Sequence, residues 1–139
     1  MSAEYKDNSK EVLSAIEKAK KNALNAIGLA AVSHATDLTP VDTGLLRNSI
    51  TYALSGEETK IKEYKADVAD KNGEIKTGSY SGTAPLDKEG SVYIGSNVEY
   101  CEYIELGGSG RTAFHMLQRA ATEHTAEYKK IMEDSMKNA

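Results

Sequence analysis

The stretch Thr39-Pro40-Val41-Asp42-Thr43-Gly44-Leu45-Leu46-Arg47-Asn48-Ser49-Ile50 decides how this chain is arranged, because it holds the change from helix to strand. The residue before a proline avoids the helical region, so a helix that arrives here ends by Pro40. A short second helix is expected directly afterwards. Thr39 is one candidate for its N-cap, with Pro40 in the first helical position, and Asp42 or Thr43 is another. The sequence leaves the choice open.

The residues before this stretch predict one long helix from Ser9 to Leu38. Its apolar stripe recurs at alternating steps of three and four, at Leu13, Ile16, Ala23, Ile27, Ala30 and His34. Such a helix spans roughly 45 Å, which exceeds the diameter of a compact domain of this size. One end is therefore expected to project or to pack on a neighbouring molecule. Gly28 weakens the middle by about 1 kcal/mol relative to alanine and is a place for a bend.

The residues after the stretch predict strands. Asn48 to Ser55 alternates between apolar and polar positions, which is typical of a half-buried strand. Thr59 to Ala69 is a second strand candidate, and Asn72-Gly73 is a hairpin-turn dipeptide that returns the chain through residues 74–76. Thr77 to Gly90 is rich in small and polar residues and is expected to be an exposed, mobile loop.

The last third predicts a strand over Ser91–Ser96, a short helix over Val98–Leu106 closed by Gly107, and a second long helix over Ala113–Met136. The fold class is therefore α+β. The whole chain, residues 1–139, is expected to be a single domain with its two long helices packed on a small antiparallel sheet of three to five strands. Residues 57–90 would form a hairpin and a loop beside it.

Composition excludes several classes of protein. The only cysteine is Cys101, so an intrachain disulfide is impossible, and a cysteine between apolar neighbours is expected to be a small buried hydrophobe. The net charge is −4, with lysines interleaved among acids, which argues against a nucleic-acid binder. The N-terminus does not resemble a signal peptide and no run is long enough to cross a bilayer, so we expect a soluble protein without a membrane partner.

The aromatic residues are mostly tyrosines: there are eight, with one phenylalanine and no tryptophan. Tyrosine is enriched at protein interfaces, because it joins an apolar ring to a polar tip. Lining a half-buried sheet is the alternative use of these residues, and both can hold at once.

Residues that would carry chemistry are scarce. The histidines His34, His115 and His124 lie outside any His-Glu-x-x-His pattern. The pairs His34/Asp37 and Glu123/Glu127 have helical spacing, but such spacings arise freely on charged helices. We therefore expect no metal, and His34 and His124 are expected to be core-edge histidines with one hydrogen bond each.

Residues 107–112 are glycine-rich but do not match a phosphate-binding loop, because Arg111 stands in the lysine position and Glu105 in that of the first glycine. The order of residues also supports no nucleophilic triad. No catalytic residue and no cofactor are predicted.

A second stretch, Tyr100-Cys101-Glu102-Tyr103-Ile104-Glu105-Leu106-Gly107, follows the first after about fifty residues. Together the two resemble the signatures of the head–tail joining, or tail-completion, proteins of long-tailed bacteriophages, the gene-product-ten-like tail components. The first matches the family's Pro-Val-Asp-Thr-Gly-x-Leu-Arg-x-Ser-Ile motif nearly residue for residue. Residues 92–107 are similar to its Val-x-Ile-Gly strand followed by Tyr-x-x-Tyr-x-Glu-x-Gly. Leu106 and Gly108 depart from the family pattern, and residues 112–117 lack the usual proline.

The resemblance implies a set of structural residues: Asp42, Thr43, Gly44, Arg47, Glu105 and Gly107. Asp42 and Thr43 would satisfy free backbone N–H groups at the turn, and Gly44 would allow close backbone approach. We expect the two motifs to meet in space, with Glu105 as the ionic partner of Arg47. Tyr100 and Tyr103 would anchor a subunit contact, with core packing as the alternative.

The function that the resemblance implies is structural, not enzymatic. Subunits would close into a six- or twelve-fold ring that joins head to tail or completes the tail, and would contact neighbouring connector and tail proteins. DNA would pass through without sequence-specific binding, and the loop 77–90 would contact the next ring. The protein would reside in the virion neck or tail, and in the host cytoplasm during assembly.

Two other functions stay open at this point. One is a monomeric or dimeric protein-binding module of a prophage or host, without catalytic activity. The other is a small hydrolase or ligand-binding enzyme, which would need a sizeable buried pocket with converging His, Asp or Glu side chains.

Overall fold

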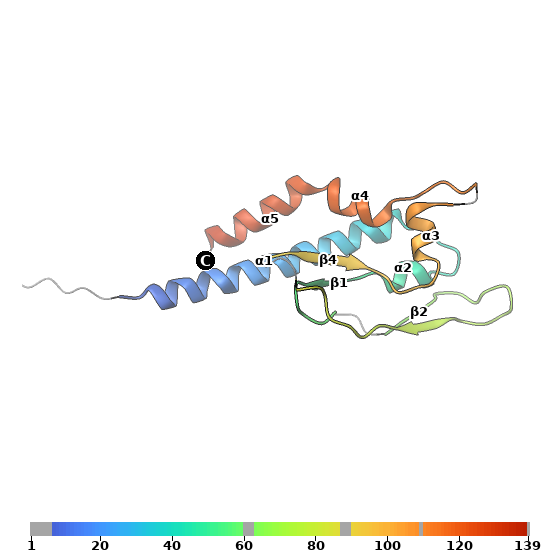
Figure 1. The fold of residues 1–139 in the computed structure, drawn as a ribbon, viewed down its shortest axis with the longest axis horizontal. Helices are drawn as coiled ribbons and strands as arrows, with labels where there is room; N and C mark the ends of the chain where they lie inside the picture. The colour runs from blue at the N-terminus through green and yellow to red at the C-terminus, as the bar shows by residue number, and fades with distance from the viewer. Residues whose placement is uncertain (1–6, 60–62, 87–89, 109, 139) are drawn as a thin grey trace, which may run out of the picture.

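The computed structural model of the chain describes residues 7–59, 63–86, 90–108 and 110–138, and it confirms the α+β class (Figure 1). In chain order the elements are α1 (Ser9–Leu38), α2 (Leu45–Ser49), β1 (Thr51–Leu54), β2 (Glu63–Lys65), β3 (Thr77–Ser79), β4 (Val92–Gly95), α3 (Cys101–Leu106), α4 (Met116–Thr122) and α5 (Thr125–Lys137).

Helix α1 has the predicted bounds and forms the long axis of the molecule (Figure 1). Helix α5 runs back along it, and near its end the Ser135 hydroxyl donates to the Ala19 carbonyl at 2.8 Å. On the N-terminal side of Ala19, every residue from Ser9 to Lys18 is exposed. We call residues 9–18 the arm. The arm projects beyond the rest of the fold, as its length predicts, and carries the exposed apolar side chains Val12, Leu13 and Ile16.

The four strands within the described residues form two separate antiparallel pairs, where a single sheet of three to five strands was expected. β1 pairs with β4, with Thr51 opposite Gly95, and β2 pairs with β3, with Glu63 opposite Ser79. The second pair does not extend the β1–β4 pair, because the chain that follows β2 is hydrogen-bonded to the segment before α2. The backbone N–H groups of residues 67 and 68 both donate to the carbonyl of Thr43.

Strand β1 is buried along its whole length, so the prediction of a half-buried strand is wrong. Helix α1 covers one face, where the ring of Tyr52 lies against Gly28. A small cavity on the other side is lined by Thr51 and Ala53 together with residues 83–85. Asn48 and Ser49, predicted to open this strand, belong to α2.

The hairpin turn at Asn72-Gly73 is confirmed: Gly73 has a φ of +77° and its N–H donates to the Asp70 carbonyl at 2.9 Å. The returning strand is β3, so the loop predicted over Thr77–Gly90 is wrong at its start. Farther on, Thr83 bridges to Glu58 and Ala84 is buried. The strand predicted over Thr59–Ala69 shortens to β2. Parts of both predictions, residues 60–62 and 87–89, lie outside the described residues.

The C-terminal helix is broken, where a single helix over Ala113–Met136 was predicted. α4 ends at Thr122 and α5 begins at Thr125, with Glu123 and His124 between them. The break turns His124 towards α1, where its ring stacks on that of His34. Across the break the Tyr128 hydroxyl donates to the Ala120 carbonyl at 2.5 Å. The apolar period of residues 113–136 is continuous, yet the helix breaks where His124 contacts α1, an element far away in the sequence.

Two small clusters form the core. One gathers buried residues from both motifs and from α4, namely Leu46, Val98, Cys101 and Met116. The other joins α1 and α4 to the residue between α2 and β1, through Ala35, Ile50 and Ala120. Cys101 is a buried free thiol, as predicted, and its burial raises the pKa of the thiol.

Candidate functional site

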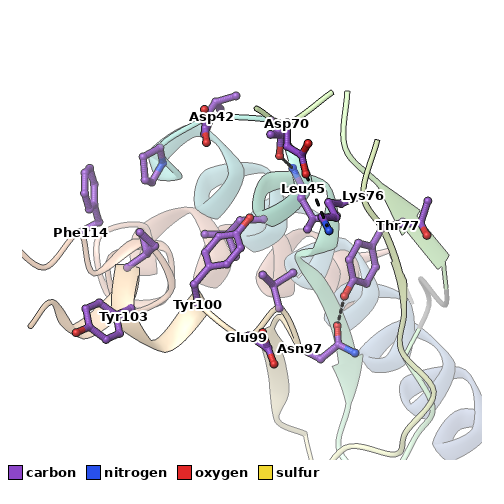
Figure 2. A pocket seen from close by; sticks show the side chains of 18 of the residues that line it. Asp42, Leu45, Asp70, Lys76, Thr77, Asn97, Glu99, Tyr100, Tyr103 and Phe114 are labelled. Carbon is purple, nitrogen blue, oxygen red and sulfur yellow. Dashed lines mark hydrogen bonds and ion pairs between the residues drawn. The ribbon is translucent and has the colours of Figure 1, made fainter. Parts of the chain in front are cut away.

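The two motifs meet at one end of the molecule, as predicted, and line a groove with a volume of about 1090 Å³ (Figure 2). We call it the motif groove. One wall is the segment from Pro40 to Leu46, and the other is the segment from Val98 to Ile104. Beneath the groove Leu46 packs with Val98, Cys101 and Met116, so the core and the groove share residues. The hairpin adds Tyr64 and Lys76, and the segment before α4 adds Phe114.

The Asp-Thr-Gly corner is a junction between two backbones. Gly44 has a φ of +87°, and a Cβ placed there would lie 2.4 Å from a carboxylate oxygen of Asp67. The Thr43 carbonyl accepts N–H bonds from Asp67 at 2.8 Å and from Val68 at 3.2 Å. Only glycine combines that backbone conformation with so close a neighbour. We expected another backbone to approach Gly44 closely, and the neighbour is instead the Asp67 side chain.

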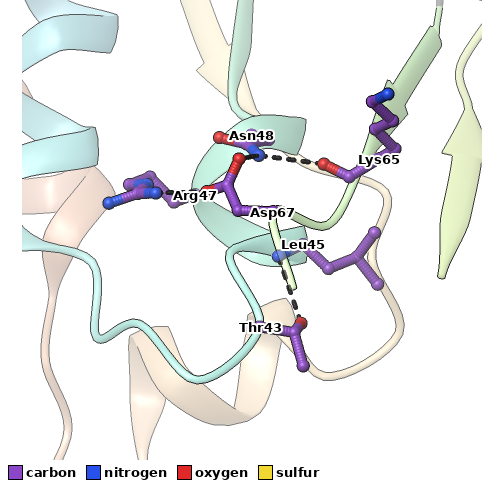
Figure 3. Close-up of polar contacts among 6 residues, drawn as sticks. All are labelled: Thr43, Leu45, Arg47, Asn48, Lys65 and Asp67. Atoms are coloured by element: carbon purple, nitrogen blue, oxygen red, sulfur yellow. Dashed lines mark hydrogen bonds and ion pairs between the residues drawn. The ribbon is translucent and has the colours of Figure 1, made fainter. Parts of the chain in front are cut away.

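The second helix begins later than the proline suggests. α2 starts at Leu45, with Gly44 in the N-cap position, so Pro40 is not its first residue. The Thr43 hydroxyl accepts the Leu45 N–H at 3.3 Å, which gives Thr43 the N–H-satisfying role predicted for it (Figure 3). Thr39 instead closes α1, where its hydroxyl donates to the Ala35 carbonyl at 2.6 Å. Asp42 is exposed at the groove (Figure 2).

Arg47 does not pair with Glu105, and that prediction is wrong. Its guanidinium donates to a carboxylate oxygen of Asp67 (Figure 3). The other carboxylate oxygen accepts from the Asn48 side-chain amide at 3.0 Å, and the same amide donates to the Lys65 carbonyl at 2.9 Å. The hydrogen bond from Asn48, and then that from Arg47, lowers the pKa of Asp67.

The Asp67 carboxylate therefore fastens the hairpin to α2. Sequence reasoning missed it, because residue 67 lay in the segment Thr59 to Ala69, which was interpreted only as a strand. One feature of the sequence could have indicated this contact. Asp67 is an acidic residue shortly before a hairpin turn, and the first motif carries two side chains, Arg47 and Asn48, that can donate to a carboxylate.

Glu105 caps a helix. Its two carboxylate oxygens accept the N–H groups of Leu117 at 2.8 Å and of Gln118 at 3.0 Å, at the start of α4. A carboxylate there also meets the positive end of the helix dipole. The backbone N–H of Phe114 donates to the Ile104 carbonyl at 2.9 Å, and that of His115 to the Glu105 carbonyl at 3.1 Å. These bonds join α3 to α4 through residues 112–117, the segment without the proline that is usual in the family that the motifs resemble.

Gly107 ends α3 with a φ of +73°. A Cβ there would lie 2.8 Å from the Arg111 carbonyl oxygen, because the chain doubles back tightly after the helix. The helix stop predicted at this position is confirmed.

Tyr100 and Tyr103 lie on the groove side of α3, and 44% and 49% of their surfaces are exposed (Figure 2). Two further exposed apolar residues, Val41 and Phe114, line the same groove. Partial burial, and next the negative charge of Asp42, raises the pKa of the Tyr100 hydroxyl. The rings are therefore only partly committed to core packing, and they give the groove an apolar, tyrosine-rich rim suited to a protein surface.

The polar groups of the groove are mainly structural. The Asp70 carboxylate accepts the N–H groups of Asn72 at 2.8 Å and Glu74 at 3.1 Å, which shapes the hairpin turn. Tyr64 donates to the Asn97 side chain at 2.5 Å (Figure 2). No histidine or cysteine is among the described residues that line the groove. The lining also includes the charged side chains of Asp42, Lys76, Glu99 and Arg111 beside the apolar rim.

No family model matches the chain, and no curated protein or solved structure matches it either. The likeness to phage tail components therefore rests on the motif residues alone. None of the described helices has the length and apolar character that a membrane span requires.

Proposed function

We propose that the protein is a non-enzymatic structural subunit of a phage or prophage neck, which joins head to tail or completes the tail as part of a ring. The observation that supports this most is the motif groove. Two sequence motifs that resemble those of tail components lie far apart in the chain, yet together they line one groove with the exposed rings of Tyr100 and Tyr103 at its rim. Such a surface is what a subunit contact requires.

A ring needs two different contact surfaces on each subunit, because head-to-tail contacts join unlike patches. The arm and the motif groove meet this requirement. The arm extends from one end of the long axis, while α2 and α3, which bear the groove, lie at the other (Figure 1). We assign the arm of one subunit to the groove of the next, where Val12, Leu13 and Ile16 would be covered. A rotation that closes would yield the six- or twelve-fold ring.

The remaining partners follow from this position in the particle. Neighbouring connector and tail proteins would meet the ring on its two flat faces, and the segment 77–90 is the candidate for one of these contacts. DNA would pass through the centre without being read. The net charge of −4 is compatible with that passage, since an acidic lumen does not hold phosphates. The protein would be found in the virion, and in the host cytoplasm during assembly.

The competing proposal is a monomeric or dimeric protein-binding module of a prophage or host. The same groove supports it, because one partner segment of apolar character would fill the space between the two motifs. The two proposals differ in the mass of the assembled particle.

The experiment is native mass spectrometry of the untagged chain over a range of concentrations, with electron microscopy of the same samples. Closed rings of six or twelve copies support the neck subunit. Particles that never exceed two copies at any concentration favour the protein-binding module.

A further inference from the structure

A cluster of three side chains with metal-binding chemistry lies away from the motif groove, between α1 and α5. It consists of His34 on α1, His124 at the break between α4 and α5, and Glu127 in the first turn of α5. One ligand atom from each of the three lies within 4.8 Å of the others. The imidazole Nε2 of His34 is 2.7 Å from a carboxylate oxygen of Glu127, and the Nδ1 of His124 is 3.8 Å from the same oxygen.

The cluster could not be found from spacing within one helix. Of the helically spaced pairs His34/Asp37 and Glu123/Glu127, the cluster takes only one member each, from two different helices. Position 124 interrupts the C-terminal helix, and this interruption lets His124 reach α1. The two imidazoles stack with their centres 3.5 Å apart and their planes at 3°, and the ring of Tyr128 flanks both.

We propose that His34, His124 and Glu127 bind a first-row divalent metal ion of the Zn²⁺ type. Two imidazole nitrogens and one carboxylate oxygen are a donor set that such ions use, with water completing a four-coordinate site. Both histidines are half-buried, whereas Glu127 is exposed and free to adjust its rotamer. Solvent reaches the site from the carboxylate side, which supplies a path for the ion.

The distances require only local movement. Bonds of about 2.0–2.2 Å in tetrahedral geometry place ligand atoms roughly 3.3–3.5 Å apart. The observed separations of 2.7 Å and 3.8 Å from the Glu127 oxygen lie on either side of that value. A coordinated ion lies near the plane of each imidazole, so two parallel rings cannot share it as they stand. Binding therefore tilts at least one ring out of the stack.

Bound metal would connect the start of α5 to the C-terminal third of α1, and none of its three ligands is among the residues that line the groove. It would also favour the break at His124 over a continuous helix. An ion that binds the folded chain and not the unfolded one raises the unfolding temperature in proportion to the logarithm of its concentration. A structural clasp between the helices is thus the expected role, and it is independent of the proposed ring.

The test is titration of the untagged full-length chain, freed of metal by chelator and dialysis, with ZnCl₂ in a calorimeter and with CoCl₂ followed by visible absorption. The proposal predicts one ion per chain, an absorption band of tetrahedral Co²⁺, and an unfolding midpoint raised by about 5–10 °C at a hundredfold excess over Kd. Affinity should fall as the pH is lowered, because protons compete for the imidazoles.

The variants His34→Gln, His124→Gln and Glu127→Gln should each weaken binding by at least about tenfold, since even the loss of a group that only orients a ligand has such an effect. Glu133→Gln is the matched control, because its carboxylate lies on α5 and pairs with Lys129 at 3.9 Å, away from the cluster. Circular dichroism confirms that each variant is folded before titration.

Three outcomes overturn the proposal. The first is the absence of saturable binding by Zn²⁺ and Co²⁺. The second is unchanged affinity in the two histidine variants. The third is binding that survives in those variants and disappears in His115→Gln or Cys101→Ser, which would place the ion at another site.

Discussion

Gly28 of α1 and Tyr52 of β1 are in contact at a distance that no other residue at position 28 permits. A Cβ on Gly28 would lie 2.2 Å from Cδ2 and 2.6 Å from Cγ of the tyrosine ring. The Tyr52 hydroxyl also donates to the Asn25 side chain at 3.3 Å, one turn earlier on the helix. Gly28 therefore sets how closely the long helix lies on the central strand, whereas its sequence position suggested only a bend.

This contact predicts that Gly28→Ala destabilises the protein. Overpacking costs about 1–3 kcal/mol, and the gain in helix propensity returns about 1 kcal/mol, so a net loss of up to about 2 kcal/mol is expected in urea unfolding. Gly95→Ala is the control, because nothing lies within 4 Å of a Cβ built there. A Gly28→Ala protein that matches or exceeds the wild type in stability would show that the helix moves away from Tyr52 without cost.

Loss of the cap that Glu105 forms on α4 should also be measurable by urea unfolding. Glu105→Ala removes the acceptor for the N–H groups of Leu117 and Gln118, and we expect it to lower the free energy of unfolding by about 1–2 kcal/mol. Glu105→Gln retains one acceptor oxygen and should lose less. Glu102, exposed on the same short helix, supplies the control variant Glu102→Ala. Equal effects of the two alanine variants would mean that the cap contributes nothing.

The contacts of Asp67 predict a dependence of stability on pH. Hydrogen bonds from Asn48 and Arg47 lower the pKa of Asp67 in the folded state, so the carboxylate stabilises the fold above its unfolded pKa. That contribution is lost as the pH falls from about 4 through the lower folded value. Acid unfolding of Asp67→Asn should therefore be less steep in this range than that of the wild type. Asp134→Asn, at an exposed site on α5, should follow the wild-type curve, and an Asp67→Asn curve that does the same would contradict the account.

If the arm of one subunit binds the groove of the next, changes in the arm should weaken self-association without altering the stability of the single chain. Leu13 and Ile16 are exposed in the single chain, so Leu13→Ser combined with Ile16→Ser should change the free energy of unfolding by no more than about 0.5 kcal/mol. The same change should weaken self-association strongly, as followed by analytical ultracentrifugation. The control is Lys10→Ser combined with Lys18→Ser, which changes two polar positions of the arm. It should leave self-association unchanged if only the apolar side chains make the contact. Association that is indifferent to Leu13 and Ile16 would exclude the arm as the contact.

Local patterns predicted much of the fold. The 3–4 period and Pro40 predicted the extent of α1, the Asn72-Gly73 dipeptide predicted the hairpin turn, and Gly107 predicted the end of α3, because each is decided by residues adjacent in the chain. The meeting of the two motifs was also predicted, although it was inferred from the resemblance and not from any local pattern.

What the sequence did not predict depends on residues that are distant in the chain. Arg47 binds Asp67 because the hairpin folds back onto α2, and Glu105 is occupied by the amides of α4. The break at His124 depends on a ring that belongs to α1. No local period encodes these choices, since each partner lies in another element.

The proposed role in a phage neck, without chemistry of its own, would make this chain necessary for completing the particle. Deleting its gene from the source phage, and examining the induced particles by electron microscopy, tests this most directly. We predict DNA-filled heads and separate tails, with joining restored by the wild-type gene but not by one carrying Tyr100→Ser and Tyr103→Ser. Intact virions formed in the absence of the gene would contradict the claim.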